Sequence, residues 1–408
     1  MTNTAILAAS AMLLFAYLLD IVGRRWRLPS VVLLIVSGIV ARLVLDSIQL
    51  QLHWIDPIVP VIGTLGLILI VLEGSLDLKV TRERLPLIGR AATSTLLGFA
   101  ATLAGFAALF RLVMNFDLSL AVLAAIPFAV ISSAVAIPAS HGLPDHPREF
   151  IIYESSLSDI VGVLVFYAWL NADGSLPGFT FDLLGGGGVS AATAVAVALL
   201  VYYFINQLEG HVRFVPLIAG LVCIYAVGKE LHLSPLIMVL GCGLLINNPR
   251  LITWHAKLRP LHSANYDQTL HEFKGLVAEL TFATKSFFFL LLGYWTDLSQ
   301  MASLNAWMIA AAGIVIIYAS RWLILAVLRQ DAAHRLLWIA PRGLITVLLF
   351  LTASEGGRLA GFPLGSVMLI VLATAALTAL AHRQAASPAT AAIVEASPSP
   401  EASPSPPD

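Results

Sequence analysis

Charged side chains lie inside several apolar stretches of this sequence, where lipid or protein rather than water would surround them. Glu154 and Asp159 fall in the stretch YESSLSDIVGVLVF, and Arg321 and Arg342 fall in two later stretches. A charge at membrane depth is unfavourable unless it has a partner. Each of these four side chains therefore needs either an ion-pairing partner or a function.

The spacing of polar residues around Asp159 is typical of a cation site. Glu154 and Asp159 are five residues apart, which separates them by about 140° around a helix and predicts different partners for them. Ser155 lies four residues before Asp159, so the two side chains share a helix face. A carboxylate beside hydroxyl oxygens suits a small, hard cation, because oxygen ligands replace the water shell of the ion.

The stretch ISSAVAIPAS brings further polar groups to the middle of an apolar segment. Ser132 and Ser133 supply hydroxyls, and Pro138 removes a backbone donor and frees carbonyls one turn back. Two interpretations remain open. The segment is either an interrupted helix that contributes ligands, or a kinked helix whose serines bond to their own backbone.

The stretch LWIAPRGLITVLLF places Pro341, Arg342 and Gly343 together among apolar residues. Proline followed closely by glycine favours a break in the helix. Arg342 must then pair with a carboxylate or with the carboxyl ends of half-helices. Both a structural role and a role in transport are consistent with this position.

Composition predicts one all-α, multi-pass membrane domain. Of the 408 residues 59% are apolar and 12% are charged, and the mean hydropathy is +0.89. The expected domain covers residues 1–382, and the Pro/Ser/Ala-rich residues 383–408 are expected to form a disordered cytoplasmic tail. About thirteen transmembrane helices are predicted, near 4–23, 29–47, 58–78, 90–114, 118–140, 149–171, 181–206, 213–228, 232–247, 273–297, 303–327, 335–354 and 360–381.

Basic residues collect in alternate loops, which predicts the orientation of the chain. Arg24, Arg25 and Arg27 follow the first helix, and most other Lys and Arg residues fall in loops on the same side. By the positive-inside rule the N-terminus lies outside and the C-terminus inside, with the protein in the inner or plasma membrane of the cell.

Short internal matches indicate inverted-topology repeats. GSLDL in the third segment corresponds to GYWTDL in the tenth, and Pro138 in the fifth corresponds to Pro341 in the twelfth. Each pair is seven helices apart, so its members cross the membrane in opposite directions. Repeats of this kind place a binding site near the bilayer midplane, where two discontinuous helices cross.

Other classes of protein find little support in the sequence. No HExxH motif is present, and His141, His146 and His271 lie in or beside loops, which argues against an intramembrane hydrolase. Cys223 and Cys242 have no CxxC or Cys/His spacing, so neither zinc nor redox chemistry is expected. The net charge of −1 gives nucleic acid no basic surface to bind. We expect no enzymatic activity and no cofactor.

Over nearly its whole membrane domain the chain resembles the monovalent cation/proton antiporter superfamily, and most of all its sodium/proton exchanger branch. ESSLSD resembles the family's Glu-Ser-x-x-Asn-Asp stretch, and APRGLI resembles its Gly-x-Arg-Gly stretch. LILIVLEGSLDL, FFFLLLGYWTDL and ISSAVAIP give weaker support.

The resemblance implies a role for each residue of the site. Asp159 would be the carboxylate that binds cation and proton in turn. Ser132 and Ser155 would take the places of a ligating Thr and a ligating Ser, and the backbone carbonyl of Ser133 would complete the shell. Ser158 stands where the family has Asn, beside the acidic residue.

Further positions follow from the same resemblance. Glu154 and Arg321 would form the family's buried ion pair, and Arg342 would match the Arg of the second broken helix. Ala134 stands where the family has proline in the first break, so Pro138 would supply that break instead.

The resemblance implies exchange of Na⁺ for protons in a homodimer that serves pH homeostasis. Because Ser158 is not acidic, one-for-one electroneutral exchange is expected. The alternatives are K⁺/H⁺ exchange and Na⁺-coupled symport of an organic anion, for which no additional Arg/Asn/Gln cluster is evident. Ligand type does not distinguish Na⁺ from K⁺ or Li⁺. The sequence assigns no role to Glu73, and it leaves Lys285 either reaching the membrane surface or pairing with Glu279.

Overall fold

The computed structural model describes residues 2–385 apart from short gaps at 27–28, 48–57, 141–142, 173–175, 182–184, 186, 208–213, 231–234, 253–265, 297, 329–332 and 360. The regular structure of these described residues is helical throughout, as the composition predicts. The last helix ends at Ala385, three residues beyond the predicted end of the membrane domain. Residues 386–408 of the predicted tail lie outside the described part of the chain.

The helices follow the predicted apolar segments closely. Each expected segment coincides with a helix or with two half-helices. The longer helices are α1 (Thr2–Trp26), α2 (Ser30–Ser47), α3 (Ile58–Asp77), α4 (Leu85–Met114), α5 (Leu118–Ala129), α6 (Ser133–Ala139), α7 (Asp145–Asn171), α9 (Gly187–Gln207), α10 (Phe214–Glu230), α11 (Pro235–Asn247), α13 (Tyr266–Trp295), α15 (Leu304–Val327), α17 (Leu344–Ser354) and α18 (Leu364–Ala385). The short elements are the 3₁₀ turns η2 (Arg82–Arg84) and η6 (Glu355–Gly357) and the helices α8 (Leu176–Phe181), α12 (Pro249–Ile252), α14 (Leu298–Met301) and α16 (Ala333–Leu336).

Several of these helices are suited to a bilayer. Among the described residues, six helical stretches are long and apolar enough to cross a membrane. Large apolar side chains such as Leu112, Leu304 and Val315 are well exposed on the outer faces of their helices, as expected where the surrounding solvent is lipid. The number of crossings and the orientation of the chain stay predictions.

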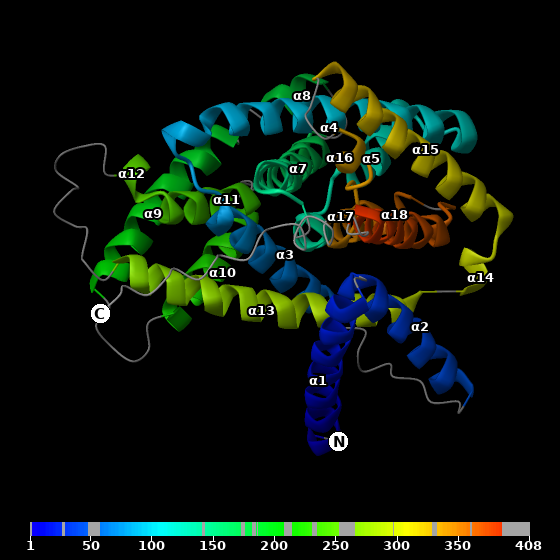
Figure 1. The fold of residues 1–408 in the computed structure, drawn as a ribbon, viewed down its shortest axis with the longest axis horizontal. Helices are drawn as coiled ribbons and strands as arrows, with labels where there is room; N and C mark the ends of the chain where they lie inside the picture. The colour runs from blue at the N-terminus through cyan, green and yellow to red at the C-terminus, as the bar shows by residue number, and fades with distance from the viewer. Residues whose placement is uncertain are drawn as a thin grey trace, which may run out of the picture.

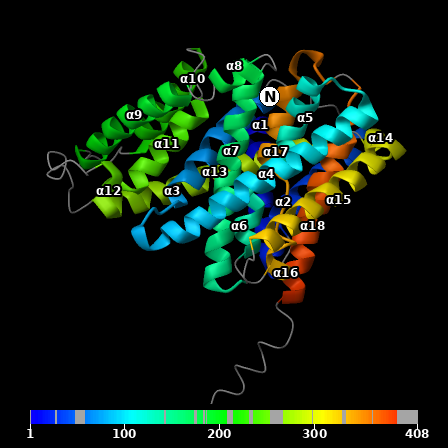
Figure 2. The same ribbon diagram turned by 90° about the horizontal axis from the view of Figure 1, so that it is seen from above.

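The helices form two bundles that pack mainly within themselves. One, here the core bundle, comprises α4, α5, α6, α7, α15, α17 and α18, and the other, the flanking bundle, comprises α1, α2, α3, α9, α10, α11 and α13. Figure 1 shows α4, α5, α7 and α15 on the opposite side of α3 from α13. Figure 2 shows α9, α10, α11 and α12 gathered at one side of the molecule. Contacts between the bundles are sparse, chiefly from α7 and α17 to α3, from α7 to α11 and from α18 to α2.

Two segments of the core bundle are interrupted helices. Residues 130–132 leave the helical conformation between α5 and α6, with Val130 and Ser132 extended, and residues 339–343 form no helix between the turn that follows α16 and the start of α17. Pro341, Arg342 and Gly343 therefore lie in the second break. The prediction that Pro138 supplies the first break is wrong, because Pro138 lies inside α6, six residues beyond Ser132. A proline late in a short helix forfeits one intrahelical bond without ending the helix.

A cluster of phenylalanines fixes the half-helices in the core bundle. Phe106 and Phe110 of α4 contact Phe128 at the end of α5, and the Phe106 and Phe128 rings stack at a centroid distance of 4.8 Å. Phe350 of α17 and Phe362 complete the cluster. Ring contacts of this kind stabilise packing beyond the apolar area they bury. The rings therefore hold short elements that have too few internal hydrogen bonds to be rigid alone.

Candidate functional site

The first break is held open by hydrogen bonds from other segments. The Ile131 amide donates to Ser158 Oγ at 2.9 Å, the Ser132 amide to the Pro341 carbonyl at 2.9 Å, and the Ser133 amide to Asp159 Oδ2 at 3.2 Å. Three consecutive backbone donors thus find acceptors outside their own segment. Without those acceptors the break would leave unpaired amides in a low-dielectric interior, at a cost of about 1–3 kcal/mol each.

The two breaks cross in direct contact. The hydrogen bond from Ser132 to Pro341 joins them, and Gly343 faces the Ser132 side chain. A Cβ added to Gly343 would lie 2.8 Å from Ser132 Cβ and closer still to its hydroxyl. Only glycine therefore allows the second break to approach the first this closely.

Asp159 is buried at this crossing with half of its carboxylate unused. The side chain is 6% exposed, and Oδ1 has no hydrogen-bond partner among the described residues. No ion pair of Asp159 is found in that part of the chain either. A buried carboxylate without a basic partner is unfavourable unless it is protonated or binds a cation. The free oxygen is the natural point of attachment for either.

The predicted oxygen ligands are all buried, but their polar groups are engaged in hydrogen bonds to different degrees. Ser155 lies one turn before Asp159 on α7, and its hydroxyl donates to the Ile151 carbonyl at 2.7 Å, which leaves its lone pairs available. Ser132 lies in the break itself. Ser133 begins α6 and presents its amide to Asp159, while its carbonyl falls in the first turn of that helix. A ligand role for that carbonyl stays a prediction of the resemblance.

Ser158, the residue before Asp159, contacts the first break and a small cavity. Besides accepting from Ile131, it lines a cavity of about 20 Å³ together with Arg321 and Arg342. A cavity of this measure holds about one water molecule. By accepting the Ile131 amide, Ser158 stabilises the first break, in addition to any contact with an ion.

Glu154 and Arg321 form a buried ion pair between α7 and α15. Arg321 Nη1 lies 2.6 Å from Glu154 Oε1, and the two side chains are 6% and 1% exposed respectively. Ser94 also donates to Oε1 at 2.6 Å, and Thr95 donates to the Glu154 carbonyl at 3.0 Å. Arg321 further donates to the Leu336 carbonyl at the end of α16. Glu154 is therefore tied to α4 and α15, whereas Asp159 is not tied to either.

Arg342 is 2% exposed, and no carboxylate lies within ion-pairing distance of it in the described part of the chain. Its Nη1 donates to the Ala340 carbonyl at 3.3 Å, and its amide donates to Thr374 Oγ1 at 3.0 Å. The positive charge therefore lies beside the free carbonyls of the second break, one of the two partners expected for it. Its Nε has no hydrogen-bond partner among the described residues.

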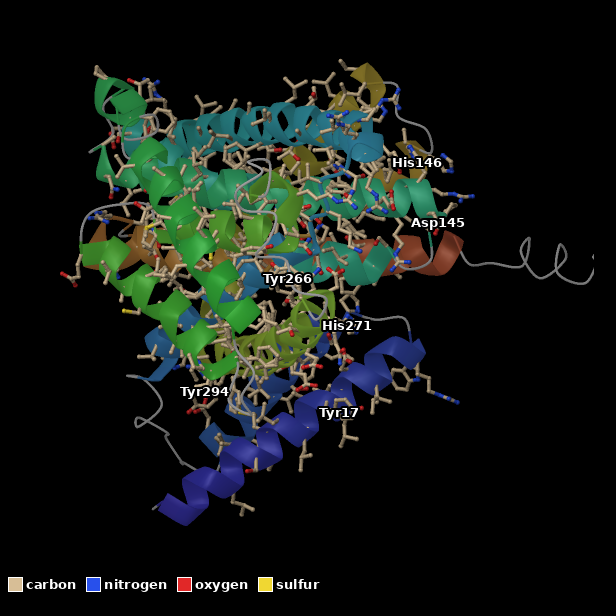
Figure 3. The ribbon with its side chains drawn as sticks, turned by 90° about the vertical axis from the view of Figure 1, so that its left-hand side faces the viewer. Tyr17, Asp145, His146, Tyr266, His271 and Tyr294 are labelled. Carbon is tan, nitrogen blue, oxygen red and sulfur yellow. The ribbon has the colours of Figure 1, made fainter. Side chains whose placement is uncertain are left out.

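The remaining charges lie away from the crossing. Glu73 of α3 interacts electrostatically with Lys285 of α13, the helix packed against α3. The suggested pairing of Lys285 with Glu279 stays a prediction. Figure 3 shows Asp145 and His146 at the edge of the molecule, at the start of α7. In the described residues no cluster of His, Cys, Asp and Glu could hold a resident metal ion.

Sequence reasoning missed the groups that hold the site in place. Ser94 and Thr95 hold Glu154, and Thr374 caps the second break. A polar stripe on apolar α4, with Ser94, Thr95 and Thr102 at spacings of seven and eight residues, is a signal that could have identified the first two. The Pro341 carbonyl has no such signal, because any residue carries a carbonyl.

Comparisons with known proteins agree on one family and one fold. The family described as "Sodium/hydrogen exchanger, transmembrane" matches residues 10–394. Two solved structures of the sodium proton antiporter MjNhaP1 from Methanocaldococcus jannaschii are similar. The structure at pH 8 has a TM-score of 0.74 at 18% identity and covers 95% of this chain and 99% of that one. The electron-microscopy structure has a TM-score of 0.71 at 20% identity, with 98% and 100% covered. A search of curated proteins returned no match.

Proposed function

The chain belongs to the sodium/hydrogen exchanger family, and from this premise we propose that it exchanges Na⁺ for protons, one for one, at Asp159. It is a multi-pass membrane protein that carries out cation/proton exchange, and it is a transporter rather than an enzyme. The identity of the cation, the stoichiometry and the residues that perform the exchange are the proposal.

The observation that carries the proposal is the contrast between two buried acids on one helix. Each acid has one oxygen without a hydrogen-bond partner among the described residues, but Glu154 is paired with Arg321 and Ser94 through Oε1, whereas Asp159 accepts the Ser133 amide on Oδ2 and has no basic partner there. A carboxylate already paired with arginine cannot release that partner for each transported ion without a large penalty. Asp159 is the acid free to bind an ion from solution.

The proposed mechanism is competition at this one carboxylate. Asp159 holds either a dehydrated Na⁺, with Ser155 and Ser132 as further oxygen ligands, or a proton. An uncompensated negative charge at the membrane midplane opposes movement of the helix that carries it. The core bundle therefore changes its position against the flanking bundle only when Asp159 is neutralised, which couples the two fluxes.

Replacement of Asp159 by asparagine tests the assignment directly. Asp159→Asn keeps the size of the side chain but removes the charge, so Na⁺-dependent proton flux in proteoliposomes with an imposed pH gradient should fall to background. Asp145→Asn, an exposed change at the start of α7, is the matched control and should retain wild-type flux. Retained cation-dependent flux in Asp159→Asn would defeat the proposal.

Electroneutrality rests on the identity of residue 158. With one ionisable carboxylate at the crossing, one positive charge moves each way, and a K⁺ diffusion potential across the vesicle should leave the exchange rate unchanged. Ser158→Asp adds a second carboxylate beside Arg321 and Arg342, and its exchange should become sensitive to voltage. Voltage-dependent flux in the wild-type protein would contradict one-for-one exchange.

Cavity size argues against the organic-anion symporter, and ion selectivity distinguishes a Na⁺/H⁺ antiporter from a K⁺/H⁺ antiporter. The cavity beside the crossing has a volume of about 20 Å³, which is too small for the organic anion of a symporter. Proton movement recorded on addition of Na⁺, K⁺ or Li⁺ in turn distinguishes Na⁺/H⁺ from K⁺/H⁺ exchange.

A further inference from the structure

The linker between α3 and α4, residues 78–81, is held from both sides by side chains. On one side, α11 and the residue after it supply two asparagines. Asn248 donates to the Leu78 carbonyl at 2.8 Å and accepts from the Val80 amide at 2.7 Å, and Asn247 donates to the same Leu78 carbonyl at 2.9 Å. These bonds fix the linker to the flanking bundle.

On the other side, the linker is bonded to the helix that carries Asp159. The Tyr153 hydroxyl of α7 donates to the Lys79 carbonyl at 2.7 Å. Arg84 donates to the same hydroxyl at 3.3 Å and forms an ion pair with Glu149 at 3.0 Å. Tyr153 is 4% exposed and packs in the small apolar cluster that includes Leu78. Its hydroxyl therefore has a defined donor and a defined acceptor.

Together these bonds make one continuous connection from α11 through the linker to α7. Tyr153 lies six residues before Asp159, about 9 Å along the helix. Because packing contacts between the bundles are sparse, even the partly buried hydrogen bond from Tyr153 to Lys79 contributes appreciably to the stability of their relative position.

We infer that Tyr153 is a positioning residue for exchange: its hydrogen bond to the linker favours the relative position of the two bundles seen here. This inference rests on the proposed function, because it assumes that the core bundle moves during transport. When the bundles separate at this end, either the bond from Tyr153 or the bonds from Asn248 must break. Removing one such bond should lower the population of this arrangement roughly two- to tenfold.

Tyr153→Phe tests the inference with little disturbance of packing, since it removes only the hydroxyl. Spin labels on Asp145→Cys in the core bundle and Glu272→Cys in the flanking bundle, with the exposed Cys223 changed to Ser, report the distance between the bundles. Figure 3 shows Asp145 and His271, the neighbour of Glu272, toward the same side of the molecule. The fraction at the wild-type distance should fall, and the initial exchange rate should change by a similar factor.

A double-mutant comparison distinguishes a role of Tyr153 in positioning the two bundles from an effect confined to the surroundings of its side chain. Tyr153 and Asn248 act in series, so Asn248→Ala should shift the distances as Tyr153→Phe does, and the double variant should shift them no further. If Asn248→Ala does not reach the membrane, Asn247→Ala, which removes another donor to Leu78, takes its place. Tyr294→Phe removes a hydroxyl elsewhere in the flanking bundle, and its distances should match the wild type.

Two outcomes overturn the inference. One is an unchanged distance distribution in Tyr153→Phe. The other is a fold-change in the population at the wild-type distance that, in the double variant, equals the product of the fold-changes in the single variants. These distances do not depend on ion flux. If Asp159→Asn retains exchange, the proposed function fails while the distances still decide the role of Tyr153. If Asp159→Asn is inactive and Tyr153→Phe is unchanged, only the role of Tyr153 fails.

Discussion

Two acidic residues five positions apart on α7 show how surroundings decide the task of a side chain. Glu154 faces α4 and α15 and is held by Ser94 and Arg321, whereas Asp159 faces the crossing and has no basic partner among the described residues. The rotation of about 140° between them around the helix makes this division possible. A buried acid with an arginine partner supports the bundle, and a buried acid without one can exchange its ligand.

Loss of Arg321 should affect stability before it affects transport. Arg321→Ala leaves Glu154 buried without its positive partner and frees the Leu336 carbonyl, which should destabilise the protein by about 3–5 kcal/mol. Thermal unfolding in detergent measures the effect, with Arg358→Ala, an exposed change, as control. Removing both charges with Glu154→Gln and Arg321→Met should recover much of the loss. Wild-type stability in an inactive Arg321→Ala protein would show that the pair is not structural.

At the scale of elements, the site depends on two short breaks in helices rather than on intact helices. Their backbone groups bond to each other and to α7 and α18, so each break supplies what the other lacks. Gly162 of α7 also allows a close approach between two segments. A Cβ on Gly162 of α7 would collide with Val130 of the first break, so glycine there lets α7 approach closely enough for Ser158 and Asp159 to reach their amides.

Gly343→Ala tests whether this close crossing is required. The added methyl group would fall on the Ser132 side chain, and overpacking of this kind costs about 1–3 kcal/mol. Because the strain falls at the site, we expect the exchange rate to drop roughly tenfold or more while the helical content measured by circular dichroism stays unchanged. Gly220→Ala on α10 meets no neighbouring atom and is the control. Wild-type exchange in Gly343→Ala would mean that the breaks need not touch.

At the scale of the whole molecule, the arrangement in two bundles is what the proposed movement of the core bundle requires. All the residues that hold the crossing belong to the core bundle, and few contacts join that bundle to the flanking one. The site can therefore travel as a unit without breaking its own hydrogen bonds. Tight packing within each bundle and loose packing between them favour movement of whole bundles over deformation of single helices.

Competition at a single carboxylate predicts how pH alters transport. As pH falls, protons occupy Asp159 in a growing fraction of molecules, so Na⁺ must displace them. The apparent KM for Na⁺ should rise on the order of tenfold per pH unit at acidic pH, while the maximal rate at saturating Na⁺ stays constant. Initial rates over a grid of pH and Na⁺ concentration measure both quantities. A maximal rate that falls with an unchanged KM would place the proton effect elsewhere in the protein.

The sequence by itself determined the membrane class, the succession of helices and the identity of the residues that stand out chemically. These follow from local properties: apolar runs long enough for a bilayer, and charges that lipid does not tolerate unless they serve a purpose. The position of Asp159, its spacing from Ser155 and Glu154, and the Pro341-Arg342-Gly343 break are all readable along the chain.

Only the tertiary structure decided how the first break is made and which oxygen of Asp159 remains free. The sequence suggested Pro138 as the cause of the break, yet the break lies at 130–132, where acceptors from α7 and from the second break replace the missing helical bonds. Those acceptors are more than 25 residues away along the chain, and one of them is a backbone carbonyl common to every residue. A hydrogen bond of that kind depends on where segments meet in space, which local sequence does not encode.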